Sequence, residues 1–428
     1  MSAAMVAEGA LSGESRRREA IEAASGSIPG RRVLLLLAAV AIGAAAFFMT
    51  VGESPQRAWG NLWYNFLFWT ALAQAGVIFG AILQATKGHW GKDFRRIAEG
   101  AGAFLPVSLL VFIDLYFGAE YIFPWVGPVE GHVNLQWLTV DGVFLRNGVL
   151  LTLMVVVSGL FLWHSLRPDA RFLEGRYSGW RAALVGRLTR NWRGDEEEAE
   201  HSRSKLSWLS PLLILMWITA FTLLAVDMAM SLLPGFLSVI WGPIYFIGGW
   251  LTLLAFVAVV AGWHAGVRER RLWSSWQFHD LGKLLFAFAI FWTYLWFSQL
   301  IVIWYGNIPR ETNWFVQRTE QGFGPLLVLQ MILIFGLPFI LLLGRAPKMK
   351  PRWLAFVALL ILLGFWIERY NLVFPSIWVG SPPLGFPELG IFVGFLGLFG
   401  LTYSLYASTF PLLPLRESLM EGEASKGP

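Results

Sequence analysis

The sequence contains no cysteine, and only 14% of its 428 residues are charged. Without cysteine this chain has no thiolate ligands for iron–sulfur clusters or zinc, no covalent attachment for c-type haem, and no disulfides. A soluble chain needs about 25% charged residues to cover its surface. Because 56% of the residues are hydrophobic, the chain is predicted to be an integral membrane protein.

Apolar runs long enough to cross the hydrocarbon core, which takes about 20 helical residues, occur ten times. They lie at residues 33–51, 61–84, 100–118, 142–164, 209–228, 238–264, 280–305, 324–344, 353–371 and 388–407. Many of the 23 tryptophans sit near the run ends, as an interfacial belt predicts. The sequence therefore predicts an all-α polytopic membrane protein with about ten transmembrane helices. Residues 33–46 also resemble a signal-peptide core. We expect a retained first helix, since cleavage would leave nine spans.

Lys and Arg are concentrated in every second segment that connects the apolar runs, together with the two tails. Of the 33 Lys and Arg residues, 27 lie in the two tails and in the segments 85–99, 165–208, 265–279 and 345–352. The other set of loops holds only Arg57, Arg310 and Arg318. This bias predicts that both termini are cytoplasmic, which agrees with an even number of spans. The basic pI therefore reflects membrane topology, and no nucleic-acid partner is expected.

The largest cytoplasmic segment, 165–208, combines arginines with the acidic run Asp195–Glu198. We expect a solvated, partly helical loop. The alternative is a docking surface for a partner or for anionic lipid headgroups.

Charged side chains within the apolar runs are costly, and they normally face the interior of the bundle, form pairs or line a water path. Counting helical rise along the runs places Asp114 and Arg146 at similar depth on the outer side, where they could form an ion pair. Asp227 lies near the outer end of its run, and Glu368 with Arg369 lies in the same outer layer. Each of these groups could equally serve a structural role.

Two further groups of polar residues belong to the seventh run. Ser298 and Gln299 lie about two-thirds of the way out, and Glu311 follows in the polar cluster that ends the helix. His279, Asp280 and Lys283 lie at the cytoplasmic end, where Asp280 and Lys283 share a helix face. Titratable groups thus form an inner and an outer layer. Interhelical hydrogen bonding is the alternative role for Ser298 and Gln299.

No cofactor ligand set is evident. A b-type haem in a membrane bundle needs two histidines at matching depth, but none of the six histidines lies near the centre of a run. His279 and Asp280 are adjacent, so their side chains diverge on a helix and form a poor metal site. We expect no catalytic residue, no metal and no cofactor bound by this chain, although quinol binding is possible.

Two segments resemble a known family. They are HDLGKLLFAFAIFWTYLWFSQLIVIWYGNIPRETNWF (279–315) and AVDMAMSLLPGFLSVIWGPIYFIGGW (225–250). Both are similar to the ActF membrane subunit of alternative complex III, an NrfD/PsrC-like protein of a bacterial quinol:cytochrome c oxidoreductase. ActF is also named as a second quinone-binding subunit. The local match is strong over these two segments, and the N-terminal 30 residues and 165–208 match poorly.

The resemblance implies two four-helix bundles with two peripheral helices in a bacterial inner (cytoplasmic) membrane. The implied partners are membrane lipid, a paralogous ActC-like subunit, a multihaem cytochrome c subunit, an iron–sulfur subunit and small anchoring subunits. Haem c and the iron–sulfur clusters would lie on those partners. The expected divisions are a tail (1–32), a peripheral helix and outer loop (33–60), a first bundle (61–228), a second bundle (229–371), and an outer loop, last helix and tail (372–428).

On this basis the chain is expected to be redox-silent, to conduct protons and to hold its partners together. Ser298 and Gln299 would carry a hydrogen-bond chain inside the second bundle. Asp227 and Glu311 would lie at its outer opening and His279, Asp280 and Lys283 at its inner opening, with Pro309 stopping the helix. Two alternatives stay open. One is a quinone-binding catalytic subunit with a pocket near Asp114 and Arg146. The other is a stand-alone secondary transporter, for which only Gly336 and Pro338 suggest a broken helix.

Overall fold

The computed structural model describes residues 18–22, 24, 26, 28–127, 136–266 and 272–416. Within these ranges the protein consists of helices and connecting segments, with no strand. Ten helical segments are long and apolar enough to cross a membrane. The predicted all-α fold with ten spans is therefore confirmed, and the chain is a multi-pass membrane protein.

Eight of the spans are formed mainly by single helices. These are α3 (Gly30–Glu53), α4 (Pro55–Thr86), α8 (Val140–Ala170), α10 (Asp195–Met228), α11 (Trp241–Gly266), α12 (Ser275–Gly306), α17 (Pro351–Ile377) and α18 (Phe386–Ala407). Short helices α9 (Gly179–Leu188), α13 (Pro309–Glu320) and α16 (Arg345–Lys348) lie in the connections.

The third and eighth spans are interrupted. The third consists of α5 (Arg95–Ala101), α6 (Leu105–Leu115) and α7 (Ala119–Ile122), joined by 3-10 turns. The eighth consists of α14 (Gly324–Met331) and α15 (Leu337–Leu341), joined by a π-helical segment at Ile332–Gly336. Pro338 lies just beyond this segment and has no N–H for a regular helical bond, which accounts for a local change in helical winding.

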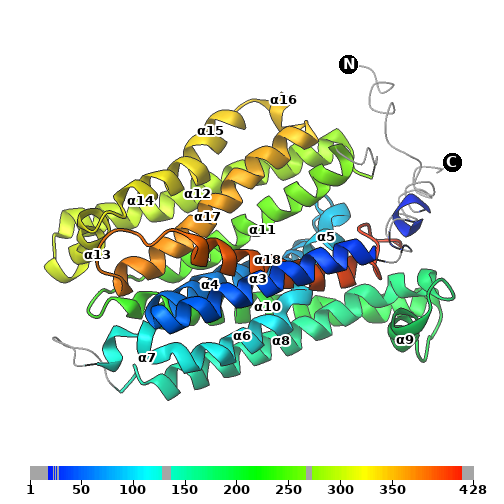
Figure 1. The fold of residues 1–428 in the computed structure, drawn as a ribbon. Coiled ribbons are helices and arrows are strands. Elements are labelled where there is room, and N and C mark those ends of the chain that lie inside the picture. The colour runs from blue at the N-terminus through cyan, green and yellow to red at the C-terminus, as the bar shows by residue number, and fades with distance from the viewer. Residues whose placement is uncertain are drawn as a thin grey trace.

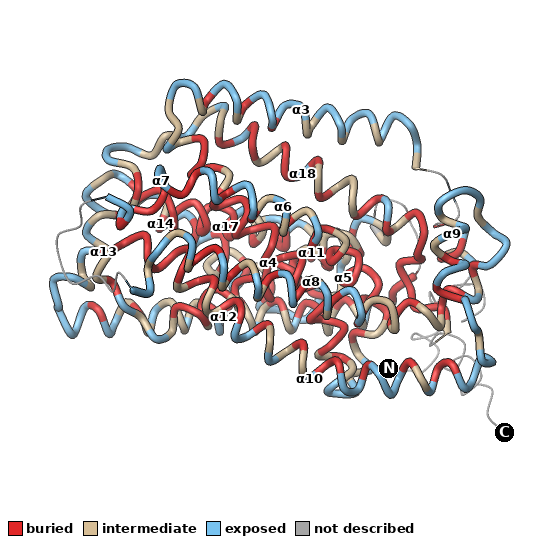
Figure 2. Tube along the Cα trace, turned by 90° about the horizontal axis from the view of Figure 1, so that it is seen from below, coloured by how far each residue is buried: buried red, intermediate tan, exposed pale blue. Residues whose placement is uncertain are grey.

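The long helices run side by side as two bundles and a peripheral pair, α3 with α18 (Figure 1). The first bundle contains α4, the α5–α7 segment, α8 and α10, and the second contains α11, α12, α14–α15 and α17. Helix α4 lies at the junction, where it contacts α10 and α8 of one bundle and α11 and α17 of the other. In the apolar 18-residue stretch of α4, 94% of the residues are buried, against 17% in the corresponding stretch of α3 (Figure 2). Helix α4 is therefore the central element of the fold.

Helices α3 and α18 form a closely packed peripheral pair along one side of this core (Figure 2). A Cβ atom built on Gly43 would come within 2.4 Å of Gly394 Cα, and one on Gly397 within 2.8 Å of Leu36 O. Glycine lets the two backbones touch, and such small-residue contacts drive helix pairing in membranes because apolar burial is no driving force there.

The two described ends of the chain lie at the same end of the molecule (Figure 1). Ile21 near the N-terminus and Leu415 near the C-terminus belong to one small apolar cluster with residues of α8 and α9. The 165–208 segment is largely helical, as expected. Its acidic run Asp195–Glu198 forms the first turn of α10, where the helix dipole favours negative charge.

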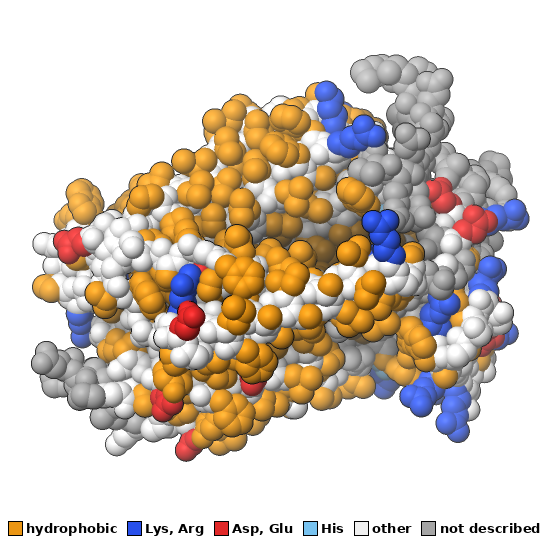
Figure 3. Space-filling view, viewed as in Figure 1, with side chains coloured by type: hydrophobic (Ala, Val, Ile, Leu, Met, Phe, Trp, Pro, Cys, Tyr) orange, Lys and Arg blue, Asp and Glu red, His pale blue; other side chains and the backbone are white. Residues whose placement is uncertain are grey.

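The surface matches the charge pattern of the sequence. In Figure 3 hydrophobic side chains cover the middle of the molecule, and most of the visible Lys and Arg lie toward the end that carries α9. An apolar belt between polar ends is the surface expected in a bilayer.

Candidate functional site: a polar ladder through the membrane

Helix α4 carries a row of buried polar side chains through an otherwise apolar core. Asn61, Asn65, Thr70 and Gln74 are each at most 1% exposed. Asn65 Oδ1 accepts a hydrogen bond from Trp366 Nε1 (3.3 Å), and Gln74 Nε2 donates to Ser158 Oγ (3.0 Å). Asn61 and Asn65 lie on the face of α4 toward α18 and α17, whereas Thr70 and Gln74 lie on the opposite face, where Gln74 meets α8. Together the four residues reach from near the outer end of α4 to about one turn past its midpoint.

The outer end of the row contacts a buried carboxylate. Glu388, in the first turn of α18, is fully buried and accepts hydrogen bonds from Asn61 Nδ2 (2.9 Å) and from Arg57 Nε (2.9 Å) and Nη2 (2.7 Å). Tyr64 and Tyr370 stand beside it with ring centroids 5.4 Å apart. Their hydroxyls have no hydrogen-bond partner among the described residues. Buried hydroxyls of this kind are normally satisfied by ordered water.

At the inner end of α4 lies a second buried carboxylate, Glu99, which has no exposure. A Cβ atom on Gly80 of α4 would come within 3.0 Å of Glu99 Oε1. Arg95 Nε donates to Glu99 Oε1 (2.8 Å), Arg96 Nη1 donates to Oε2, and Ser165 Oγ donates to Oε1 (2.5 Å). The carboxylate therefore sits in a fully hydrogen-bonded pocket between α5 and α8.

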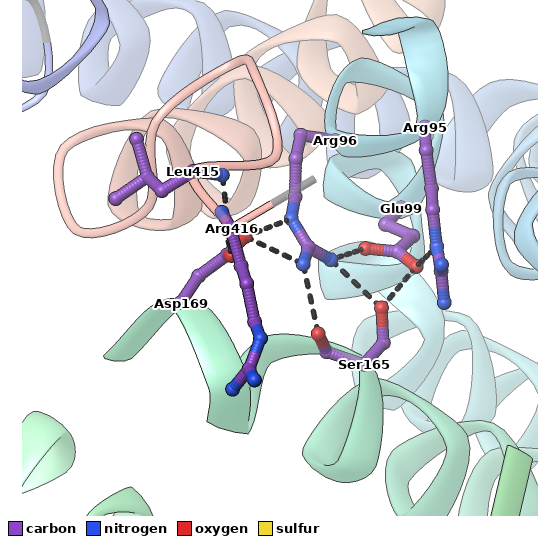
Figure 4. A network of polar contacts seen from close by, with 7 residues as sticks. All are labelled: Arg95, Arg96, Glu99, Ser165, Asp169, Leu415 and Arg416. Atoms are coloured by element: carbon purple, nitrogen blue, oxygen red, sulfur yellow. Dashed lines mark hydrogen bonds and ion pairs between the residues drawn. The ribbon is translucent and has the colours of Figure 1, made fainter. Parts of the chain in front are cut away.

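The Glu99 pocket extends to the C-terminal segment (Figure 4). Arg96 also binds Asp169 Oδ2 through Nε (2.9 Å) and Nη2 (2.7 Å). The other oxygen, Asp169 Oδ1, accepts from the backbone N–H groups of Leu415 and Arg416, both at 3.1 Å. One guanidinium thus joins two carboxylates from two helices, and one of these holds the chain end in place.

A third buried ion pair joins α8 to α10 on the outer side. Asp227 has no exposure and accepts from Arg146 Nε (2.6 Å) and Nη2 (2.8 Å), from Asn147 Nδ2 (2.7 Å) and from Trp137 Nε1 (3.0 Å). The expected pair of Arg146 with Asp114 is therefore wrong. Similar depth along two helices does not show which way each helix is rotated.

Asp114 instead faces an apolar groove of about 490 Å³ between α3, α4, α6 and α18. The aromatic side chains Phe47, Phe48, Trp59 and Phe117 line the same groove. No hydrogen bond or ion pair joins Asp114 to another described residue. Asp114 is exposed along this groove, so a donor from another molecule can reach its carboxyl group.

Glu368 and Arg369 of α17 lie buried between the helices. Both are at most 2% exposed, and their charged atoms are 2.8 Å apart. Arg369 Nη2 also donates to Tyr245 O (3.2 Å), and the guanidinium lies 4.3 Å from the centre of the Tyr245 ring. The pair links α17 to α11 across the second bundle.

Arg318 of α13 is fully buried and has a clear structural partner. Pro375 lacks an N–H, so it cannot bond Asn371 O four residues earlier in α17. Arg318 Nε donates to that oxygen (3.0 Å), and Nη2 donates to Leu372 O (3.3 Å). The guanidinium stacks on Trp314 at 3.8 Å, and burial lowers the pKa of Arg318 to about 9. Arg318 thus supplies the bond that Pro375 cannot make.

Gln299 and Ser298 differ in placement. Gln299 is 8% exposed and accepts from Ser238 Oγ, which precedes α11, whereas Ser298 Oγ is half-buried and donates to Tyr294 O of its own helix (2.8 Å). The structure therefore does not place Ser298 in a chain with Gln299.

Asn307, in the left-handed conformation at φ 47°, ends α12, and Pro309 begins α13. Pro309 therefore follows the end of α12 and is also the first residue of α13. Glu311 lies half-buried in the first turn of α13.

The inner group of the seventh span is a surface pair. Lys283 Nζ lies 2.7 Å from Asp280 Oδ1, as the spacing predicted, and His279 Nδ1 lies 3.9 Å from the same oxygen. Lys283 is exposed and Asp280 half-buried. Among the described residues no group of three metal-ligating side chains occurs. His132 lies outside the described residues.

Sequence reasoning missed the ladder on α4 and both carboxylates that it joins. Arg95 and Arg96 were counted as loop charges, and Glu388 lay at the edge of the last apolar run. A usable signal was present, since Asn61 and Asn65, and then Thr70 and Gln74, are each spaced by four residues on one helix.

The fold and its buried charges define a polytopic helical membrane protein with a polar core. Comparison with models of known protein families gives no match, and comparison with curated proteins gives none either. What the chain does must therefore be argued from its own residues.

Proposed function

We propose that the chain is the ActF-like integral membrane subunit of a respiratory quinol:cytochrome c oxidoreductase of the alternative complex III type. In this role it provides a proton path and a scaffold in a bacterial inner membrane. The redox centres belong to its partners, which are an ActC-like subunit, a multihaem cytochrome c and an iron–sulfur subunit. The segments at 225–250 and 279–315 support the family, and the positive-inside pattern supports cytoplasmic termini.

The observation that carries the proton path is the set of buried polar side chains on two faces of α4, between two buried carboxylates. From Asn61, which contacts Glu388, to Gly80, which lies against Glu99, the helix rises about 28 Å. That is close to the hydrocarbon thickness of about 30 Å. Buried hydroxyls and amides without protein partners lie along this row, among them Tyr64 OH and Thr70 Oγ1. Such groups can hold a chain of water molecules.

This path replaces the one expected from the sequence. Asp227, paired with Arg146, acts as a strut between α8 and α10. Glu99 and Glu388 are also paired with arginines, and they mark the two ends of the proposed path because they lie against α4 at Gly80 and at Asn61.

Purification from the native membrane in mild detergent tests the assignment to a complex. A c-type haem spectrum and an iron–sulfur subunit should accompany this chain. If the chain comes out alone and colourless, the proposal fails and the secondary transporter becomes the leading hypothesis.

Within the purified complex, Gln74→Leu tests the path. We expect proton movement in proteoliposomes to fall at least tenfold, while quinol-dependent haem reduction continues. Thr293→Val is the matched control, since Thr293 Oγ1 bonds only Ala289 O of its own helix (2.8 Å). Equal proton movement in both variants would rule out the ladder as the route.

A second function, quinone binding by this chain, is supported by the groove at Asp114. Its aromatic walls and single carboxyl group suit a quinol ring. Asp114→Asn should then lower the amount of quinone that co-purifies, whereas Asp141→Asn, at the outer end of α8, should not. Unchanged quinone content in Asp114→Asn would remove this alternative.

A further inference from the structure

A long groove runs between the second bundle and the α3–α18 pair. Its inner part has a volume of about 470 Å³ and its outer part about 420 Å³. Phe256, Val259 and Phe399 line both parts, so the two are continuous. In Figure 3 this face is hollowed between the upper bundle and the pair that crosses it.

The outer part of the groove is built for hydrocarbon. Its lining consists of apolar and aromatic side chains from α4, α11, α17 and α18, such as Leu72, Leu359 and Phe392, and contains no charged residue. The groove has apolar protein walls and lies within the membrane belt, so an apolar chain fills it at no cost in desolvation of polar groups.

The inner mouth of the groove has the opposite character. Arg32 and His264 lie there together with Trp263 and Tyr403, and among the described residues no Asp or Glu lines either part. Arg32 is exposed, and no described carboxylate pairs with it. Trp263 is 54% exposed, as tryptophans at a membrane interface commonly are. The mouth is therefore a cationic site at the level of the inner headgroups.

The length of the groove suits one long chain. Along α18 it extends from Tyr403 to Leu389, which corresponds to about 21 Å of helix. Half of the hydrocarbon core is about 15 Å thick. A molecule with its headgroup at Arg32 would thus reach past the middle of the membrane while remaining between protein walls.

We propose that this groove binds an anionic phospholipid of the inner leaflet, with its phosphate at Arg32 and one acyl chain between α11, α17 and α18. The positive charge of Arg32 favours an anionic phospholipid over a neutral quinol. A phosphate diester complements the arginine, whereas a neutral isoprenoid quinol would leave Arg32 without a counter-charge. The inner leaflet also carries anionic lipids. The bound lipid joins the α3–α18 pair to the second bundle.

The test is lipid retention by the purified protein. The full chain, with any partners that accompany it, is extracted in mild detergent, washed extensively and examined by native mass spectrometry and by chromatography of its extracted lipids. We expect about one anionic phospholipid per chain. Arg32→Gln should lower that amount about fivefold, since one basic residue near an anionic surface contributes about that factor. Arg31→Gln, a change of the same kind outside the lining, should not.

Two further variants test the groove itself. Val259→Phe fills the part that both hollows share and should abolish retention of lipid, whereas Val149→Phe, on an exposed face of α8, should have no effect. If Val259→Phe is not monodisperse, Val260→Phe fills the inner part alone. Equal retention in Arg32→Gln and Arg31→Gln overturns the proposal, as does finding a neutral quinol in place of the phospholipid.

Discussion

The buried ion pairs of this protein join side chains from distant parts of the chain. Asp227 binds Arg146, 81 positions away in the sequence, and Glu388 binds Arg57 across 331 positions. A charge that is removed from water is tolerated only when its partner and its remaining hydrogen bonds are supplied. Each of these carboxylates meets that condition with two or more donors.

Removing the charge of Asp227 tests the first pair. Asp227→Asn should lower the free energy of unfolding by about 3 kcal/mol, since Arg146 is left without its counter-ion. Arg146→Gln combined with Asp227→Asn should recover much of that loss. The measurement is denaturation of the purified protein in detergent, followed by tryptophan fluorescence. A stable single variant would show that the pair is not structural.

Arg318 and Pro375 make a second prediction at this scale. Arg318→Met should destabilise the protein by about 2 kcal/mol, because Asn371 O and Leu372 O lose charged hydrogen-bond donors. Pro375→Ala restores the backbone N–H for Asn371 O. The double variant should therefore lose less stability than the two single changes added together. Strict additivity in the same denaturation assay would contradict the proposed compensation.

At the scale of elements, α3 is held to the molecule mainly by α18. Gly43, Gly394 and Gly397 let the two backbones approach, and a side chain at any of them would collide with backbone atoms. Since lipid is as apolar as leucine, this close packing replaces the hydrophobic effect as the source of stability.

Replacing Gly394 should separate the pair. In the same denaturation assay, Gly394→Ile should lower the free energy of unfolding by about 2 kcal/mol, because a side chain there collides with the backbone of Gly43. Gly159→Ile, whose new Cβ meets nothing within 4 Å, is the control. An unchanged free energy of unfolding in Gly394→Ile would show that this contact is dispensable.

For the whole molecule, the central question is which end faces the cytoplasm. The end with α9 and the two described ends of the chain carries most of the described basic residues, and we expect it inside. Single cysteines replacing Arg187 of α9 and Arg310 of α13, both exposed, report the two ends. In intact cells an impermeant maleimide should label only the cysteine at 310, and both after permeabilisation. Labelling of 187 alone would reverse the orientation.

The number of spans and the alternation of charge could be predicted from the sequence. Both properties are local and add along the chain, because each apolar run meets the bilayer by itself and each loop carries its own charge. The Asp280–Lys283 pair was also predictable, since both residues lie on one helix.

Which polar residues meet was decided only by the tertiary structure. In a soluble protein an apolar stripe shows how a helix is rotated, but a membrane helix is apolar on the side that faces lipid as well as on the side that faces protein. Asp114 and Asp227 therefore looked alike in the sequence, although one faces a groove and the other is enclosed. Asn61 meets Glu388 of α18 and Gln74 meets Ser158 of α8 on opposite faces of α4, because helices pack against α4 on more than one side.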